Sequence, residues 1–184
     1  EAYNLASYHT VGRVAKGGKV GAEASTNKIF WSELDLLLHE TALRILGLRL
    51  RADLGDLAKQ PRPYVVVANH QSNYDLFIFG SVIPQRTVSV GKTSLKWMPF
   101  FGQVYWLAGN VLVERGNAEK AKQSMLKTTD VMRHHDTSIW FFAEGTRNLG
   151  RGLLPFKKGA FQMAIAAGVP IIPLCCSSYK KTMQ

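Results

Sequence analysis

The strongest constraint on the fold is the alternation of short apolar runs with helix-like segments after Pro63. The runs are rich in β-branched and aromatic residues, as expected of buried strands. They occupy residues 64–68, 87–90, 110–113, 138–142 and 169–176. Helix-like segments separate some of them, at residues 74–82, 117–134 and 158–167. This order predicts an α/β fold, with a mostly parallel central sheet flanked by helices.

Boundary residues support two of these helices. Asn117 is a favourable N-cap for the second helix, and Gly168 is placed to end the third.

The first residue is Glu1 rather than Met, and the chain stops shortly after a strand-like run. Both features are typical of a fragment or a processed form.

The first 60 residues are organised differently, and we treat them as separate from a domain at residues 61–184. Residues 1–27 are rich in Gly, Ala, Ser and Lys and predict a loose arm. Residues 29–50 carry apolar side chains at helical spacing, which predicts an amphipathic helix. Such a helix packs on its own domain or lies in a membrane interface. No stretch reaches the roughly 18 consecutive apolar residues of a spanning helix.

The charge balance narrows the class of partner. The chain has 23 Lys and Arg against 13 Asp and Glu, a formal net charge of +10. A basic surface attracts nucleic acid, an anionic membrane, phosphorylated substrates or an acidic protein. The basic residues are scattered, without an arginine-rich arm or zinc-finger spacing, so nucleic acid is not the expected partner. Cys175 and Cys176 are adjacent, which fits reduced thiols better than a metal site or a disulfide framework.

Polar clusters follow several of the predicted strands, where an α/β sheet builds its binding site. His70 and Asp75 come after the first strand. A carboxylate on one ring nitrogen fixes the tautomer of a histidine and leaves the other nitrogen free as a base. His70 and Asp75 are five residues apart, so in a continuous helix their side chains would point roughly 140° away from each other. We therefore expect His70 in the turn and Asp75 in the first helical turn.

Alternatives to this His–Asp pair remain open at this point. Asp75 can cap the helix while His70 hydrogen-bonds the backbone. Ser72 lies close enough to be a nucleophile, yet no G-x-S-x-G elbow frames a serine in the chain. A His–Asp pair without an attached nucleophile suggests that the substrate supplies one, typically a hydroxyl.

Basic residues near the other strand ends suggest phosphate binding. Arg147 offers a planar fork of donors that matches phosphate oxygens, and Gly145 allows a sharp turn. Lys92 and Arg115 can complete the set, although each taken singly is more often a solvated charge. A structural ion pair between Glu144 and Arg147 is the alternative.

An apolar patch lies beside Lys92, at residues 97–101. A segment of the hydrophobic core is the default interpretation of such a run. Contact with an acyl chain or a membrane is the alternative.

Four motifs in this order resemble the glycerolipid acyltransferase family, and especially its bacterial 1-acylglycerol-3-phosphate acyltransferases. The motifs are N-H-x4-D, K-x2-L-x6-G-x12-R, F-x-E-G-T-R and V-P-I-I-P. They are matched by Asn69, His70 and Asp75; by Lys92, Leu95, Gly102 and Arg115; by Phe142, Glu144, Gly145, Thr146 and Arg147; and by residues 169–173. The resemblance covers residues 64–176.

The resemblance implies direct acyl transfer without a covalent enzyme intermediate. His70, oriented by Asp75, would take a proton from the sn-2 hydroxyl of lysophosphatidic acid. Lys92, Arg115 and Arg147 would hold the phosphate, while Glu144, Gly145 and Thr146 would belong to the glycerol-phosphate pocket. The acyl donor would be acyl-CoA or acyl carrier protein, and no metal or bound cofactor is expected.

The resemblance also implies a membrane surface as partner and a place at the cytoplasmic face of the inner (plasma) membrane, peripheral or N-terminally anchored. In that setting Phe30, Trp31 and the leucines of the amphipathic segment are expected membrane contacts. Glycerol 3-phosphate or another lysophospholipid remains an alternative acceptor. A thioester or phosphoester hydrolase and a non-catalytic lipid-binding module are alternatives of other classes.

Overall fold

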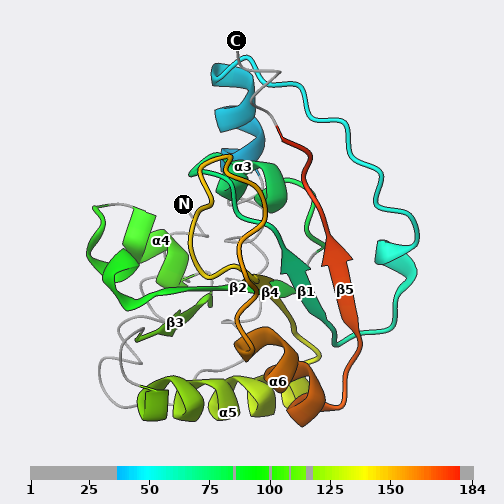
Figure 1. Cartoon of the computed structure of the whole chain (residues 1–184), viewed down its shortest axis with the longest axis vertical. Coiled ribbons are helices and arrows are strands. Elements are labelled where there is room, and N and C mark those ends of the chain that lie inside the picture. Colours follow the sequence, from blue (N-terminus) through cyan, green and yellow to red (C-terminus); the bar gives the residue numbers. More distant parts are fainter. Residues whose placement is uncertain (1–36, 85, 100, 108, 115–117, 179–184) are drawn as a thin grey trace, which may run out of the picture.

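The computed structural model of the chain describes residues 37–84, 86–99, 101–107, 109–114 and 118–178 (Figure 1). The predicted arm at residues 1–27, together with Phe30, Trp31, Arg115 and Asn117, lies outside the described residues. The strands are β1 (Val65–Ala68), β2 (Thr87–Lys92), β3 (Val111–Val113), β4 (Ser138–Phe142) and β5 (Ile171–Leu174). The helices are η1 (Leu57–Lys59), α3 (Asp75–Gly80), η2 (Thr93–Trp97), α4 (Phe101–Leu107), α5 (Ala118–His135) and α6 (Gly159–Ala167), besides a helical stretch at residues 37–45.

The strands form one sheet in the order β3-β2-β4-β1-β5. Every adjacent pair is parallel, which confirms the predicted α/β class. β1 lies in the interior of the sheet, with Val66 opposite Trp140 of β4 and Ile172 of β5. All four of its residues are buried, because both faces of the sheet are covered at this point.

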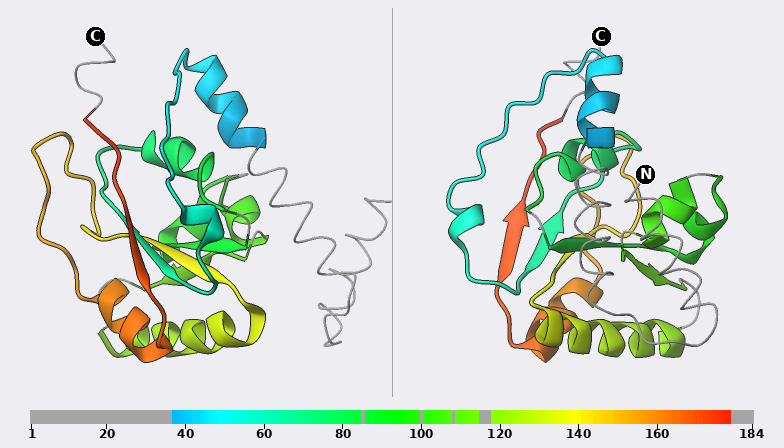
Figure 2. Two further views of the ribbon diagram at one scale, coloured as in Figure 1. Left: turned by 90° about the vertical axis from the view of Figure 1, so that its right-hand side faces the viewer. Right: turned by 180° about the vertical axis from the view of Figure 1, so that it is seen from behind.

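The alternation of side chains along β1 divides the core into two layers. Val65 and Val67 face α5 and α6, where they meet Met132 and Met163. Val66 and Ala68 face the other way, in a cluster that includes Phe79 of α3 and Trp140. Figure 2 shows α5 and α6 on the side of the sheet opposite α3 and the helical stretch at 37–45. The sheet is thus the middle of three layers.

α4 covers the α3 face of the sheet near β2. The Tyr105 hydroxyl lies 2.7 Å from the Ser89 hydroxyl, and Ser89 stands opposite Trp140 in the register. A Cβ on Gly91 would come within 2.6 Å of the Tyr105 hydroxyl, so a glycine is required for this close approach. The sequence pattern did not predict α4: the apolar patch at residues 97–101 included only its first residue, Phe101, and residues 102–107 were assigned to no element.

Trp97 and Met98, at the start of the apolar patch at residues 97–101, are not part of the core. Trp97 is 80% exposed and Met98 is also exposed, so the default interpretation of residues 97–101 as a core segment is wrong for these two side chains. The short 3-10 helix η2 turns them outward at the end of β2. The alternative, contact with an acyl chain or a membrane, stays a prediction.

The amphipathic segment ends earlier than its apolar pattern suggested. Residues 37–45 are helical, whereas residues 46–50 are not. Gly47 has a φ of +67°, and the amides of Gly47 and Leu48 donate to the carbonyls of Arg44 and Leu43, which is a Schellman ending. One face packs on the domain, since Leu43 is buried and the His39 ring lies against Phe77.

The other helix and strand boundaries agree closely with prediction. α6 ends before Gly168, whose φ of 69° and ψ of 36° are left-handed as expected of a C′ glycine. β5 is shorter than the predicted run at 169–176, because only Ile171–Leu174 pairs with β1. Within the described residues, no helix combines the length and the apolar character needed to cross a membrane.

Candidate active site

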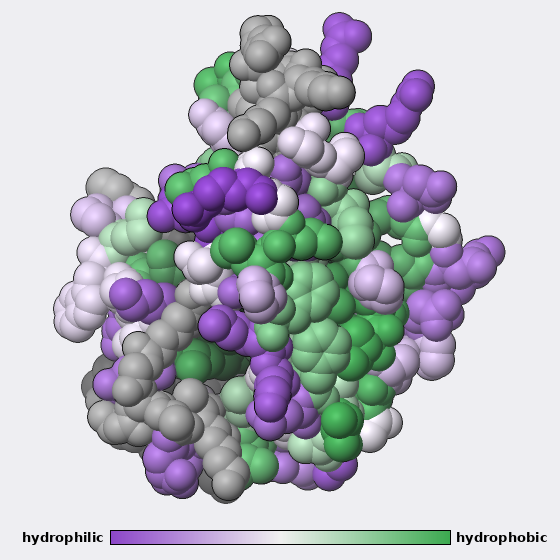
Figure 3. Space-filling model, viewed as in Figure 1, coloured by the Kyte–Doolittle hydropathy of each residue, from purple (hydrophilic) through white to green (hydrophobic). Residues whose placement is uncertain are grey.

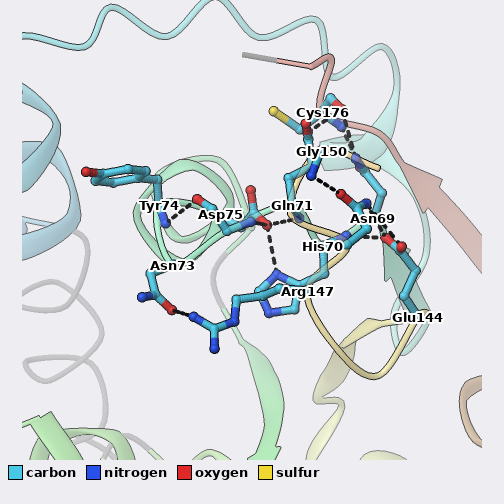
Figure 4. A network of polar contacts seen from close by, with 12 residues as sticks. Asn69, His70, Gln71, Asn73, Tyr74, Asp75, Glu144, Arg147, Gly150 and Cys176 are labelled. Carbon is cyan, nitrogen blue, oxygen red and sulfur yellow. Dashed lines mark hydrogen bonds and ion pairs between the residues drawn. The ribbon is translucent and has the colours of Figure 1, made fainter. Parts of the chain in front are cut away.

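His70 and Asp75 meet at the carboxyl end of β1, as the five-residue spacing predicted. The Nδ1 atom of His70 lies 2.8 Å from Oδ2 of Asp75 (Figure 4). His70 occupies the turn after β1, and Asp75 is the first residue of α3. The Asp75 side chain is fully buried, whereas 17% of the His70 side chain is exposed. Among the described residues, Nε2 of His70 has no hydrogen-bond partner, so one ring nitrogen is held and the other is available.

The same carboxylate oxygen also organises the turn. Oδ2 of Asp75 accepts hydrogen bonds from the backbone amides of Gln71 and Ser72, the latter at 2.9 Å. The N-cap position of α3 is occupied by Tyr74, and the carboxylate of Asp75 holds the ring of His70. The alternative in which Asp75 caps the helix while His70 bonds the backbone is therefore wrong. With Asp75 ionised as an acceptor, the proton of a neutral His70 ring belongs on Nδ1.

The ring of Phe142 stacks against one face of the His70 ring. The two ring centroids are 3.8 Å apart and the planes are inclined by 12°, which is a stacked arrangement. Phe142 is the last residue of β4, the strand beside β1. The stack and the Asp75 contact restrict both the tilt and the rotation of the imidazole.

Glu144 lies inside the protein, with 1% of its surface exposed. Its Oε1 accepts the backbone amide of His70 at 2.6 Å, and its Oε2 accepts the backbone amide of Leu154 at 2.8 Å. The side chain of Asn148 donates to both oxygens, at 3.2 and 3.1 Å. The expected alternative of an ion pair with Arg147 is not formed. The predicted contribution of Glu144 to substrate binding stays a prediction.

Arg147 points to the other side of the turn. Its Nη1 donates to the side-chain oxygen of Asn73 at 2.7 Å (Figure 4), and the residue is exposed. Gly145 has a left-handed φ of 69°, and its amide donates to the carbonyl of Phe142 at 3.0 Å. The tight turn at Gly145 thus separates the inward side chain of Glu144 from the outward side chain of Arg147.

The other residues predicted to bind substrate are Lys92, Thr146 and Arg115. Lys92 is exposed at the carboxyl end of β2, three residues beyond the pairing of Ser89 with Trp140. Parallel strands bring this end to the same edge of the sheet as His70. Thr146 is exposed in the loop after β4. Arg115 lies outside the described residues, so its role in phosphate binding stays a prediction.

Two polar side chains for which the sequence predicted no role, Asn69 and Gln71, tie the end of β5 to the site. Asn69 exchanges two hydrogen bonds with the backbone of Cys176, and Gln71 donates to the carbonyls of Cys176 and Ser177. Burial, with smaller effects of the Asp75 and Cys175 charges, raises the pKa of the Cys176 thiol. Only Asn69 had a signal in the sequence, because it belongs to the first motif. No cluster of three His, Cys, Asp or Glu side chains that could hold a metal ion occurs in the part of the chain described.

A parallel sheet with a His–Asp pair at its carboxyl edge fits the class suggested by the four motifs. Residues 52–177 match the model of the Acyltransferase family, more than half of the chain. The chain belongs to this family of acyltransferases, and the resemblance seen in the motifs is confirmed.

Relatives of known name include the 1-acyl-sn-glycerol-3-phosphate acyltransferase of Haemophilus influenzae, 48% identical over 73% of this chain and 56% of the relative. The protein of the same name from Escherichia coli is 54% identical over 62% of this chain and 46% of its own length. The mouse 1-acyl-sn-glycerol-3-phosphate acyltransferase alpha is 40% identical over 79% and 50%. The chain thus spans about half the length of these relatives.

A solved structure shares the fold. The crystal structure of the 1-acyl-sn-glycerophosphate (LPA) acyltransferase PlsC from Thermotoga maritima superposes with a TM-score of 0.69. Sequence identity is 19%, and the match covers 92% of this chain and 64% of that one. At this identity the likeness supports the α/β architecture and nothing finer.

Proposed function

We propose that the chain carries the acyl-transfer site of an enzyme that esterifies the sn-2 hydroxyl of 1-acylglycerol 3-phosphate. The product would be phosphatidic acid. The observation that carries the proposal is the His70–Asp75 pair, with Nδ1 held at 2.8 Å and Nε2 available. The names of the bacterial and mammalian relatives support this acceptor.

The proposed reaction needs only the residues at the end of β1 and the two substrates. Nε2 of His70 takes the proton of the sn-2 hydroxyl while the oxygen attacks the thioester carbonyl. The carbon–sulfur bond breaks, and the departing thiolate recovers the proton from His70. Asp75 stabilises the imidazolium that forms between these steps. No metal ion and no bound cofactor takes part in this scheme.

Charge supports the proposed way of holding the substrates. Arg147 and Lys92 are exposed near the carboxyl edge, where they and Arg115 would bind the acceptor phosphate. The donor would be acyl-CoA or acyl carrier protein. An acidic carrier protein would be attracted by a chain of net charge +10.

We further propose that the enzyme works at the cytoplasmic face of the inner (plasma) membrane. The acceptor and the product are lipids, so the site needs an interfacial surface. The helical stretch at 37–45 supports this, since Leu37 and Leu38 at its start and Ile45 at its end are exposed although Leu43 is buried.

The test is acylation of 1-acylglycerol 3-phosphate by the purified protein, with acyl-CoA and acyl carrier protein thioesters in parallel. We expect phosphatidic acid from the wild type and a loss of kcat of at least 100-fold, on the order of 10² to 10⁴, in His70→Ala. The circular dichroism spectrum of the variant serves as the folding control.

Other products or acceptors would redirect the proposal. Free fatty acid without phosphatidic acid would identify a hydrolase. Turnover restricted to glycerol 3-phosphate or to another lysophospholipid would change the acceptor but keep the chemistry. Tight binding of the lysolipid without turnover would indicate a lipid-binding module.

A further inference from the structure

We propose that Glu144 is a positioning residue, which fixes the backbone of the base His70 and does not bind substrate. The proposal rests on the function proposed above, because it takes His70 as the base. It differs from the substrate contact expected for Glu144 from the sequence. Figure 4 shows the Glu144 carboxylate directed at the backbone of the turn after β1, on the side of the turn away from Asn73.

The hydrogen-bonding capacity of the Glu144 carboxylate is fully used inside the protein. An ionised carboxylate has about four lone-pair sites and no donor. Glu144 accepts four hydrogen bonds: one from the amide of His70, one from the amide of Leu154 and two from the side chain of Asn148. A substrate hydroxyl would have to displace one of these donors in a group that is 1% exposed. Such a replacement is unfavourable because the displaced donor would be left buried.

The turn that carries His70 is held by two carboxylates from opposite sides. Glu144 accepts the amide of His70, whereas Asp75 accepts the next two amides, of Gln71 and Ser72. The carbonyls of the turn are also engaged. Those of His70 and Gln71 accept the amides of residues 148 and 149, at 2.7 and 3.1 Å. Asp75 orients the imidazole ring of His70, whereas Glu144 fixes the position of the His70 backbone from which that side chain extends.

The second role of Glu144 is to couple this turn to the loop after β4. Its two oxygens join the turn to Asn148 and to Leu154 in one hydrogen-bonded unit. A glutamine of the same shape would present an amide N–H₂ group to donors. Either the His70 amide or the Leu154 amide would then lose its acceptor, and in both cases the hydrogen-bonded unit that holds the turn would be broken.

The kinetic test compares Glu144→Gln with Asn148→Ala. Asn148→Ala removes the side-chain contacts of the loop but leaves the Glu144–His70 bond. We expect Glu144→Gln to lower kcat on the order of 100-fold with little change in the KM for 1-acylglycerol 3-phosphate, as for a base displaced by about 1 Å. Asn148→Ala should lower kcat much less. Melting temperatures of both variants provide the stability comparison.

Two kinetic results would overturn the proposal. A raised KM with unchanged kcat in Glu144→Gln would mean that Glu144 contacts the substrate. If kcat falls in proportion to the melting temperature, and does so to the same degree in Glu144→Gln and Asn148→Ala, then Glu144 acts only through the stability of the protein. If Glu144→Gln does not fold, Glu144→Asp replaces it, because the shorter carboxylate keeps the charge but cannot reach all its donors.

A second measurement does not depend on the reaction. The Nδ1 proton of His70, hydrogen-bonded to Asp75, is followed by proton NMR in the free protein and assigned by its absence in His70→Ala. We expect the signal in the wild type and in Asn148→Ala, and its loss or broadening in Glu144→Gln. An unchanged signal in Glu144→Gln would overturn the proposal. If the wild type does not acylate the lysolipid, the proposed function fails, and this comparison still decides the role of Glu144.

Discussion

At the scale of single residues, the site is built from carboxylates that accept several backbone donors each. Asp75 takes the His70 ring and two amides on one oxygen, and Glu144 takes four donors on two oxygens. Hydrogen bonds to charged acceptors are stronger than neutral ones. The backbone of the turn therefore acquires a defined geometry from these hydrogen bonds, in addition to the stacking of His70 on Phe142.

Cys176 offers a way to observe the charge of Asp75. Burial raises the pKa of the Cys176 thiol, and the charge of Asp75 adds to the shift. Because the thiolate is the reactive form, iodoacetamide at mildly alkaline pH should alkylate Cys176 more slowly than the exposed Cys175. Asp75→Asn should lower the pKa of Cys176 and speed its alkylation. The effect should be partial, because burial is the larger cause. Peptide mass spectrometry measures both rates.

The sign of the pH dependence provides the control for this prediction. A raised pKa means that Cys176 becomes thiolate only at a higher pH than an ordinary thiol. The difference between wild type and Asp75→Asn should therefore disappear once the pH is high enough to deprotonate the thiol in both. Slower alkylation in the variant at mildly alkaline pH would contradict the assignment of the charge effect.

At the scale of elements, the end of α6 is defined by Gly168 and by a side chain of α5. Gly168 is left-handed, and its amide donates to the carbonyl of Ile165 at 3.2 Å. The guanidinium of Arg133 donates to the carbonyls of Ala166 and Ala167, at 2.7 and 3.2 Å. These bonds satisfy carbonyls that the last turn of a helix leaves open. They also hold α6 against α5 beneath β1.

Gly168→Ala should destabilise the protein by about 1 kcal/mol. A Cβ at this position meets no atom within 4 Å, so the cost is the left-handed backbone alone and not a clash. Urea denaturation measures the free energy of unfolding. Gly168→Asn is the matched control, because asparagine adopts this conformation more readily and should lose less stability. An alanine variant as stable as the wild type would refute the conformational argument.

At the scale of the whole molecule, charge and exposed apolar groups point to the proposed membrane contact. Figure 3 shows hydrophilic side chains along the edge of the molecule where residues 46–63 run in the same view of Figure 1. Among these residues, Arg49, Arg51 and Arg62 are exposed. Exposed aromatic and aliphatic groups occur elsewhere, at Trp97 and in the helical stretch at 37–45. Basic groups attract anionic lipid and apolar groups enter the headgroup boundary, so we expect both sets of residues to contribute to membrane binding.

We expect the protein to co-sediment with vesicles that contain anionic lipid and to bind neutral phosphatidylcholine vesicles more weakly. Binding to the anionic vesicles should weaken as salt rises, since a Debye length of about 8 Å at 0.15 M shortens further. The control is Trp97→Ala on neutral vesicles, where apolar contact dominates and binding should fall. Equal binding to both lipids at all salt concentrations would rule out an electrostatic contribution.

From the sequence alone, we could predict the succession of the five strands and of α3, α5 and α6 along the chain, and a spacing at which His70 and Asp75 can meet, while an Asp75 that caps the helix stayed an alternative. Both are encoded over short stretches: side-chain periodicity predicts each element, and five residues separate the two site residues. Even the end of α6 was predictable, because a glycine after a helix-forming run is a local signal.

The contacts that hold His70 and Asp75 in place could be known only from the folded protein. The bond from Glu144 to the His70 amide joins residues 74 positions apart, and Asn69 reaches Cys176 across 107. The exposure of Trp97 likewise depended on how η2 leaves β2. Such contacts form only when parallel strands distant in the chain bring their carboxyl ends to one edge. No local pattern carries that information, since it depends on which strands lie side by side.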